Sequence, residues 1–315
     1  MNQRFEPAYL KLHRSGELKA RVQAAYKRLE ACDICPRECG VNRRESAKGA
    51  VCRTGERSVV SSFNPHFGEE SPLVGRGGSG TIFFSWCNLK CQYCQNYEIS
   101  QLGHGREMEP EDLANMMLQL QAMGCHNINF VSPTHVVPQI LAGVLIAAEA
   151  GLRLPLVYNT GCYDSLKTLA LLDGVFDIYM PDIKYADAEI ARRYSKIEDY
   201  PRHNQAAVKE MHRQVGDLVM DERGVALRGL LIRHLVLPNG LAGTAEIVRF
   251  LAEKVSKDTY LNVMDQYRPC HKAHELPDVN RRLTAQEYEE AVQLAHEAGL
   301  HRLDKRGPRL IWLWR

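Results

Sequence analysis

The chain has 315 residues, 45% of them hydrophobic, and a formal net charge of +2. This length suits one large α/β domain with an appendage, and the hydrophobic content is ordinary for a globular protein. A nearly neutral chain gives no compositional support for a nucleic-acid or membrane partner. No stretch approaches the ~18 uncharged apolar residues that a membrane-spanning helix needs.

The ten cysteines indicate the compartment and the chemistry to expect. The N-terminus opens with charged residues, Arg4 and Glu6, and has no apolar core of a secretory signal. Many cysteines in a protein that is not secreted are typical of metal ligation in a reducing environment rather than of a disulfide framework. We therefore expect a cytoplasmic, metal-binding protein.

The first 75 residues read as an extension in front of the main domain. Ala20–Leu29 has the spacing of a basic amphipathic helix. Four thiols follow in the pattern Cys-x2-Cys-x3-Cys-x12-Cys: Cys32, Cys35, Cys39 and Cys52. This spacing suits a closed site for structural Zn²⁺ or for a second [4Fe–4S] cluster, which could relay electrons. Thiolates select both, with a slight preference here for zinc as the staple of a segment too short to build a core; reduced free thiols are the remaining alternative.

A second cysteine motif directly follows the strand-like stretch Thr81–Trp86. Cys87, Cys91 and Cys94 have the pattern Cys-x3-Cys-x2-Cys. Three thiolates on one short loop suit a [4Fe–4S] cluster, which ordinarily takes four cysteines, so one iron is left without a protein ligand. An open coordination position is typical of a catalytic metal rather than of a structural one. Three free thiols are a weak alternative, because such close cysteines are hard to place without a metal.

From this point on, apolar strand-like runs alternate with segments of helical periodicity. The six predicted strands are rich in Ile, Val, Phe or Tyr: Thr81–Trp86, Asn127–Ser132, Pro155–Asn159, Asp177–Lys184, Leu230–Leu237 and Tyr260–Gln266. The predicted helical segments are Glu111–Met123, Val137–Ala150, Ser165–Leu172, Asp187–Leu218, Ala245–Val255 and Glu287–Ala298, the last with Thr284 as N-cap. This alternation indicates a parallel sheet, either open and doubly wound or curled into a barrel.

The motif around Cys87, Cys91 and Cys94, with Tyr93 before its last cysteine, resembles that of the radical S-adenosylmethionine (SAM) superfamily. Residues 30–275 resemble the uncharacterised relatives of pyruvate formate-lyase activating enzyme that carry Cys-Pro-Arg-x-Cys-Gly-Val-Asn-Arg upstream of this motif. The resemblance implies a partial, TIM-like (β/α)6 barrel over residues 76–315, preceded by the metal-binding extension at 1–75. In such barrels the chemistry lies at the carboxyl ends of the strands.

The resemblance also implies a radical SAM oxidoreductase. The open iron of the [4Fe–4S] cluster would chelate SAM, and an electron from a donor such as flavodoxin or ferredoxin would split SAM into a 5′-deoxyadenosyl radical. The radical would abstract hydrogen from a substrate, either a glycine of a partner protein, as the activating enzymes do, or a small molecule. A non-catalytic iron–sulfur or zinc scaffold is the alternative from another class of protein.

The same resemblance implies which residues contact SAM. Ser132 and Thr134 stand where the activating enzymes have a Gly-Gly-Glu run, and would offer backbone and hydroxyl groups in its place. Asp182 and Lys184 correspond to the family's Asp-Leu-Lys, with a salt bridge across the barrel mouth as the structural alternative. Arg233 corresponds to an arginine that contacts SAM in the family. A scaffold protein would not need these charged residues at a barrel mouth.

Other polar residues follow the predicted strands. Asn159 suits the ribose of SAM, or else a turn, and His271 would replace a histidine that lies near SAM in the activating enzymes. Cys270 is a candidate hydrogen-atom donor or metal ligand, or a buried small hydrophobe. His135 is a candidate proton carrier or a loop histidine bonded to backbone, and Cys125 is expected in the core.

The end of the chain, Leu310–Trp314, is apolar and aromatic. We expect it to dock on the barrel as a strand or plug, because a free tail would expose too much apolar surface.

Overall fold

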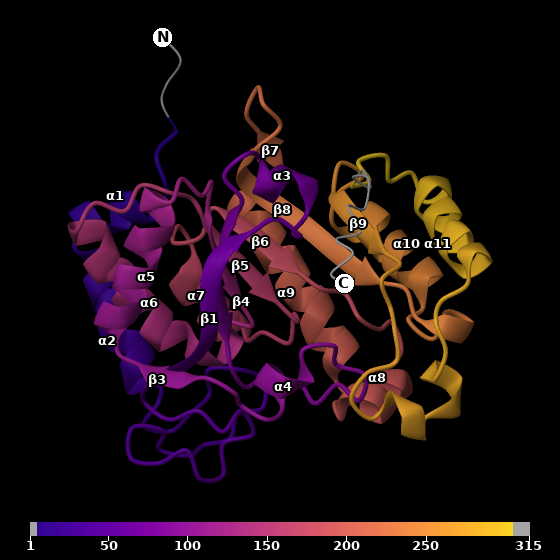
Figure 1. The fold of residues 1–315 in the computed structure, drawn as a ribbon, viewed down its shortest axis with the longest axis horizontal. Coiled ribbons are helices and arrows are strands. Elements are labelled where there is room, and N and C mark those ends of the chain that lie inside the picture. The colour runs from indigo at the N-terminus through magenta and orange to yellow at the C-terminus, as the bar shows by residue number, and fades with distance from the viewer. Residues whose placement is uncertain (1–4, 305–315) are drawn as a thin grey trace, which may run out of the picture.

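The computed structural model describes residues 5–304, and within them nine strands form one mixed sheet (Figure 1). The order across the sheet is β3-β1-β2-β4-β5-β6-β8-β7, and β9 pairs with the other part of β8. The strands are β1 Ser58–His66, β2 Ser79–Phe84, β3 Arg106–Met108, β4 Ile128–Val131, β5 Leu156–Thr160, β6 Ile178–Pro181, β7 Val219–Met220, β8 Ala226–Leu235 and β9 Tyr260–Met264.

Six of these strands run parallel and follow one another in chain order: β2, β4, β5, β6, β8 and β9. They are the six strands predicted from the sequence, with displaced ends. The order of the sheet does not pair β9 with β2 within residues 5–304, so the parallel part stays open between its first and last strands. The α/β class and the partial (β/α)6 barrel are therefore confirmed.

Strand β1 was missed by the sequence analysis. It lies antiparallel on the outer edge of β2, with His66 opposite Ser79. Its sequence mixes polar residues and Pro65 with apolar ones, so neither alternation nor a continuous apolar run marks it. Residues 58–66 thus belong to the sheet, while the division of the chain at residue 75 stays a prediction. The short strands β3 and β7 were also missed.

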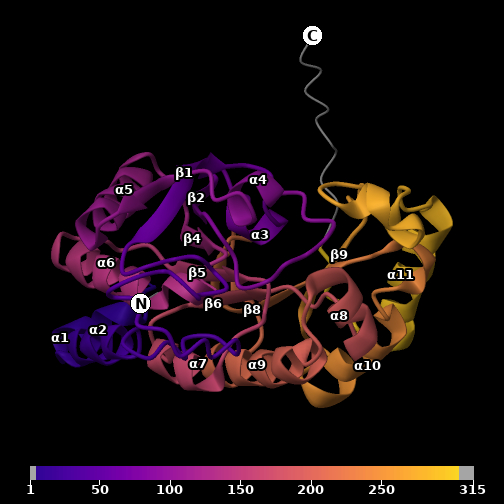
Figure 2. The same ribbon diagram turned by 90° about the horizontal axis from the view of Figure 1, so that it is seen from below.

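Helices surround the strands, and Figure 2 shows most of them in an arc around the sheet. The predicted helical region Asp187–Leu218 is two helices, because Lys196 at the end of the first has a left-handed φ of 59°. The helices of four or more residues are α1 Tyr9–Arg14, α2 Glu17–Lys27, α3 Ser71–Val74, α4 Tyr97–Ser100, α5 Pro110–Ala122, α6 Val137–Glu149, α7 Leu166–Leu172, α8 Ala188–Ser195, α9 Tyr200–Val215, α10 Thr244–Lys254 and α11 Ala285–Glu297.

The two faces of the sheet have different partners, because successive side chains of a strand point to opposite faces. One set, which includes Phe130 and Tyr158, packs with the helices in the main core. The other set faces the inside of the barrel, where Val157 and Leu231 pack with Leu73 of α3. Helix α3 lies between β2 and β9 in Figure 2, on the open side of the barrel.

The remaining predictions about the fold concern the periphery. Cys125 is buried in the main core, as expected. The predicted C-terminal strand or plug, Leu310–Trp314, lies outside the described residues. Across residues 5–304, no helix is both long enough and apolar enough to cross a membrane.

Helix α11 begins with the predicted cap. The hydroxyl of Thr284 accepts a hydrogen bond from the N–H of Glu287 at 3.2 Å, and the Glu287 carboxylate accepts one from the N–H of Thr284 at 2.9 Å. Thr284→Ala should lower the free energy of unfolding by about 1 kcal/mol, measured by denaturant unfolding, because it leaves an N–H of the first turn without its partner. Gln286→Ala, at an exposed position of the same turn, is the control. An equal loss in both variants would contradict the cap.

Candidate functional site

The cysteine loop leaves the carboxyl end of β2 and is held in place by its neighbours. Cys91 Sγ lies 3.0 Å from the hydroxyl of Ser195, and Cys94 Sγ lies 3.1 Å from the hydroxyl of Ser100. The N–H of Leu89 donates to Cys87 Sγ at 3.4 Å. The three sulfur atoms therefore already have the weak hydrogen-bond contacts that orient thiolate ligands.

The electrostatics of this loop require a positive partner for the thiolates. Burial, with smaller contributions from Cys91 and Cys94, raises the pKa of Cys87 to about 12. The Cys87 thiol therefore stays protonated near neutral pH unless a bound metal supplies positive charge. The donor set of three sulfur atoms within one loop thus fits a [4Fe–4S] cluster that keeps one iron open.

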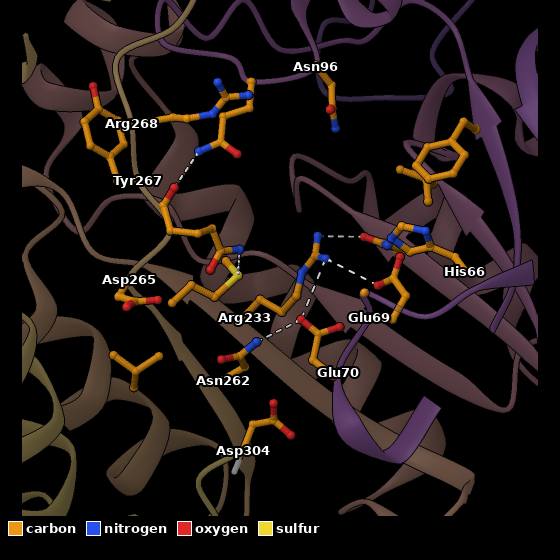
Figure 3. Close-up of a pocket in the computed structure, with 18 of the residues that line it drawn as sticks. His66, Glu69, Glu70, Asn96, Arg233, Asn262, Asp265, Tyr267, Arg268 and Asp304 are labelled. Carbon is orange, nitrogen blue, oxygen red and sulfur yellow. Dashed lines mark hydrogen bonds and ion pairs between the residues drawn. The ribbon is translucent and has the colours of Figure 1, made fainter. Parts of the chain in front are cut away.

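A cavity of about 820 Å³ opens beside this loop, at the carboxyl ends of the parallel strands (Figure 3). Gln95 and Asn96, which directly follow the last cysteine of the motif, line one side of it. Phe83, Val131, Asn159, Arg233 and Met264 line it from β2, β4, β5, β8 and β9. This is the position at which barrels of parallel strands place their chemistry.

Arg233 is the centre of a buried charge cluster in this cavity. Its guanidinium lies 2.8 Å from Asp182 Oδ1 and donates to Asn159 Oδ1 at 2.7 Å. Two further carboxylates, Glu69 Oε2 and Glu70 Oε1, lie 3.9 Å from the same group. Figure 3 shows the side chains of Glu69 and Glu70 beside that of Arg233. The cluster is therefore rich in carboxylate.

Lys184 joins the cluster through Asp182. Its ammonium lies 2.6 Å from Asp182 Oδ2. Burial alone would raise the pKa of Asp182, but Arg233 and Lys184 outweigh burial and hold this pKa below its ordinary value. For Lys184 burial acts to lower the pKa, and the negative charges of Asp182 and Cys91 raise it above the ordinary value instead. Asp182, Lys184 and Arg233 are charged at neutral pH.

The predicted SAM contacts thus separate into groups. Asn159 and Arg233 line the cavity, and Asp182 and Lys184 support Arg233. Thr134 is buried and lies with its hydroxyl 2.9 Å from that of Thr160, while Val131 lines the cavity from the same end of β4.

The loop after β4 is held by backbone contacts. Ser132 has a left-handed φ of 60° and donates its N–H to the carbonyl of Asn159 at 2.9 Å. His135 is 1% exposed and bonds through Nε2 to the carbonyl of Ser85. Burial and Arg43 lower the pKa of His135 to about 3, so it does not suit a proton carrier; the alternative of a loop histidine bonded to backbone is correct.

The loop after β9 packs against α4, the short helix that follows the cysteine motif. His271 stacks on Tyr97 of α4, with 5.2 Å between ring centroids, and has a φ of 54°. The neighbouring residues Asp265, Gln266, Tyr267 and Arg268 line the cavity instead. Cys270 is half-buried and not in a disulfide.

Glu69 and Glu70 are among the site residues that the sequence analysis missed. They precede the first predicted strand and lie in a segment without strand or helix periodicity. Two consecutive acidic residues are common on protein surfaces, so the pair gave no signal. Only the return of the chain after β1 brings them next to Arg233.

The four-cysteine segment packs directly on the cysteine loop. Arg37, between Cys35 and Cys39, donates to the carbonyl of Asn88 at 3.0 Å. Arg53, next to Cys52, lies with its guanidinium 5.2 Å from the ring centroid of Trp86, the residue before Cys87. The two motifs are therefore neighbours in space.

Inside the four-cysteine segment a buried arginine contacts the thiol of Cys32. Arg43 is 1% exposed; it contacts Cys32 Sγ at 3.6 Å and donates to the carbonyls of Thr54 and His135. Within residues 5–304, no three His, Cys, Asp or Glu side chains are grouped around the position of a single metal ion. A [4Fe–4S] cluster differs from a single ion because it holds each thiolate on a different iron.

An open parallel barrel with a three-cysteine loop and a polar cavity at its mouth defines a class of enzymes that use an iron–sulfur cluster. The family model of the radical SAM superfamily matches residues 81–233. The chain is 35% identical to the Methanocaldococcus jannaschii protein MJ0674 over 292 residues, which are 90% of this chain and 79% of that protein. It is 24% identical to MJ0808 of the same organism, over 85% of this chain and 78% of that protein. The chain belongs to the radical SAM superfamily and is an enzyme whose cofactors are a [4Fe–4S] cluster and SAM.

The solved structures that resemble this chain are more distant than these relatives. Streptococcus suis SuiB bound to precursor peptide SuiA has a TM-score of 0.48 at 12% identity, over 70% of this chain and 47% of SuiB. A radical SAM methyltransferase from Sphaerobacter thermophilus has a TM-score of 0.47 at 13% identity, over 72% of this chain and 66% of that protein. The chain thus spans less than two thirds of either structure.

Proposed function

We propose that the protein cleaves SAM reductively and uses the resulting radical to remove a hydrogen atom from a bound substrate, as a radical SAM oxidoreductase. The observation that supports this most directly is the placement of Gln95 and Asn96, next to Cys94, on the wall of the 820 Å³ cavity. When bound, a reduced [4Fe–4S] cluster supplies the electron that splits SAM into methionine and a 5′-deoxyadenosyl radical. Cys87, Cys91 and Cys94 would hold that cluster.

The residues of the cavity have roles that follow from their charges. Arg233 and Lys184 provide positive charge toward the carboxylate of SAM, while Asp182 orients both cations. Asn159 would offer a polar side chain to the ribose, and the backbone at Ser132 and Thr134 would replace the glycine loop of the activating enzymes. Because these charged side chains are buried, water does not compete for their contacts.

For the substrate we propose a glycine of a partner protein, as in the activating enzymes, with a small molecule as the second candidate. The cavity lies in the upper part of the ~300–1,000 Å³ range of ligand sites, which suits SAM together with a substrate group. The electron would come from a flavodoxin- or ferredoxin-type donor in the cytoplasm.

Reductive SAM cleavage tests the proposal. Anaerobically reconstituted protein with dithionite and SAM should form 5′-deoxyadenosine and methionine, detected by mass spectrometry. Deuterium transfer into 5′-deoxyadenosine from a protein substrate labelled at glycine would identify the first candidate, and transfer from a labelled small molecule the second. A protein that binds the cluster and SAM but forms no 5′-deoxyadenosine would be a scaffold, and the proposal would be wrong.

We further propose that Cys32, Cys35, Cys39 and Cys52 hold a separate metal, either zinc or a second [4Fe–4S] cluster. The contacts Arg37–Asn88 and Arg53–Trp86 favour the cluster, because they bring this segment within reach of the cysteine loop for electron transfer.

Cys35→Ser should remove this second metal, lower the thermal stability, and leave SAM binding in place, because metal binding in such a segment is coupled to folding. Metal analysis of the purified variant measures the loss, and Cys125→Ser, at a buried cysteine of the main core, is the control. An unchanged iron and zinc content in Cys35→Ser would contradict the assignment.

A further inference from the structure

The part of the cavity around Arg233, Glu69 and Glu70, which we call its floor, carries more negative than positive charge. Glu69 and Glu70 come from the segment between β1 and α3, and their side chains are 8% and 4% exposed. Both face Arg233, which is already paired with Asp182 at 2.8 Å. With Lys184 also on Asp182, three buried carboxylates share two cations. One negative charge is left without a counterion, and an uncompensated buried charge is costly.

One oxygen of this pair has no hydrogen-bond partner. Glu70 Oε1 accepts from the side chain of Asn262 at 3.0 Å, but Glu70 Oε2 is buried and has no hydrogen-bond partner among the described residues. Figure 3 shows Glu70 and Asn262 on one side of Arg233, and Asn96 of the cysteine loop on the other. Glu70 lines the cavity, and its unpartnered carboxylate oxygen leaves this residue with the capacity to accept a hydrogen bond from a ligand.

A second unpartnered polar group lies on the inner face of the barrel. Asn129 of β4 is fully buried, and neither Oδ1 nor Nδ2 has a hydrogen-bond partner within residues 5–304. It shares its strand face with Val131, which lines the cavity. The barrel interior therefore has unused hydrogen-bonding capacity at Asn129 as well as at Glu70.

We propose that Glu69 and Glu70 bind a positively charged nitrogen group of the substrate, a primary ammonium or a guanidinium, on the floor of the cavity. This inference rests on the proposed function and names the substrate class of the same site. We favour an organic cation over a metal ion because of the groups that already surround Glu70. Asn262 and Arg233 both present N–H groups to this carboxylate, as expected where the ligand is also held by N–H hydrogen bonds. The ammonium of SAM itself is the other source of such a group, and the test separates the two.

The pKa of Glu69 reflects the same excess of negative charge. Burial and the charge of Glu70 raise the pKa of Glu69 to about 7, against the opposing effect of Arg233. Burial lowers the pKa of His66, so this neighbour does not supply the missing charge. At low pH a proton on Glu69 therefore neutralises the excess negative charge of the cluster. A cation that binds there has to displace this proton.

Several other charged and titratable groups lie around Glu69 and Glu70. They are His66 from β1, Asp182 after β6, Arg233 from β8, Asp265, Arg268 and Arg282 along the cavity wall, and Asp304 after α11.

Titration calorimetry of the reconstituted protein with n-butylammonium tests the proposal, with n-butanol as the neutral control ligand. Glu69→Gln/Glu70→Gln should weaken n-butylammonium binding about tenfold or more, the effect of a lost charge-assisted hydrogen bond. Affinity in the unchanged protein should rise about tenfold from pH 6 to pH 8, as the Glu69 proton is lost. Glu289→Gln/Glu290→Gln, an exposed adjacent pair on α11, is the matched control and should leave the affinity unchanged.

SAM binding is measured on the same variants, together with iron content and thermal unfolding to show that they are folded. We expect Glu69→Gln/Glu70→Gln to bind SAM no more weakly than the unchanged protein, because Arg233 keeps its contact with Asp182. Equal n-butylammonium affinity in this variant and the unchanged protein would overturn the proposal. A parallel loss of SAM affinity would assign the pair to the ammonium of SAM, and a site that responds to K⁺ or Mg²⁺ but not to n-butylammonium would assign it to a metal; either result also overturns it. Absence of SAM cleavage alone would overturn the proposed function and leave this binding result intact.

Discussion

A variant in which Cys87, Cys91 and Cys94 are all replaced by Ala should lose the iron–sulfur signal that responds to SAM in electron paramagnetic resonance. The reason is the thiol chemistry of the loop. These three residues supply all the sulfur ligands of the motif on one short segment, and a [4Fe–4S] cluster is not held without thiolates. The expected effect is complete loss of the signal and of SAM cleavage, with the fold retained by the main core.

The measurement compares reduced protein with and without SAM, for the unchanged chain and the triple variant. A matched control replaces Cys125 and Cys162 with Ala, because both are buried cysteines outside the two motifs. The control should keep the signal, although a core cavity lowers its stability. If a SAM-responsive cluster persisted in the triple variant, the assignment of the three cysteines would be wrong.

Arg233→Ala should lower the free energy of unfolding by about 3–5 kcal/mol, since it leaves buried carboxylates without their cation. Asp182, Glu69 and Glu70 all depend on this guanidinium. Arg213→Ala is the control, because Arg213 also pairs with two carboxylates but is 58% exposed, and exposed pairs contribute about 0–1 kcal/mol. Denaturant unfolding of both variants measures the difference.

The same variant tests the SAM pocket. Loss of a charge-assisted hydrogen bond should weaken SAM binding by about 2 kcal/mol without removing the cluster. Adding Glu69→Gln and Glu70→Gln to Arg233→Ala should restore part of the stability but not the SAM affinity. Unchanged SAM affinity with an intact cluster would mean that Arg233 acts on its protein carboxylates and not on SAM. Unchanged stability would contradict the charge balance of the cavity.

Local sequence pattern predicted the features that depend on neighbours along the chain. Six strands followed from apolar runs between Gly, Pro or Asn, and the start of α11 followed from Thr284. Both cysteine motifs are visible in the sequence because the proposed ligands of each site lie on one short segment. Spacing alone, however, did not decide between an open sheet and a barrel.

Contacts between distant segments were decided by the tertiary structure. The antiparallel addition of β1 to β2 returns the chain to the open side of the barrel, where Glu69 and Glu70 meet Arg233. The docking of Arg37 on the carbonyl of Asn88 likewise joins two motifs whose spacings say nothing about each other. Spacing within a segment specifies the direction and chemistry of its own side chains. The partner of a buried charge depends instead on which strands lie side by side, and that follows from packing of the whole sheet.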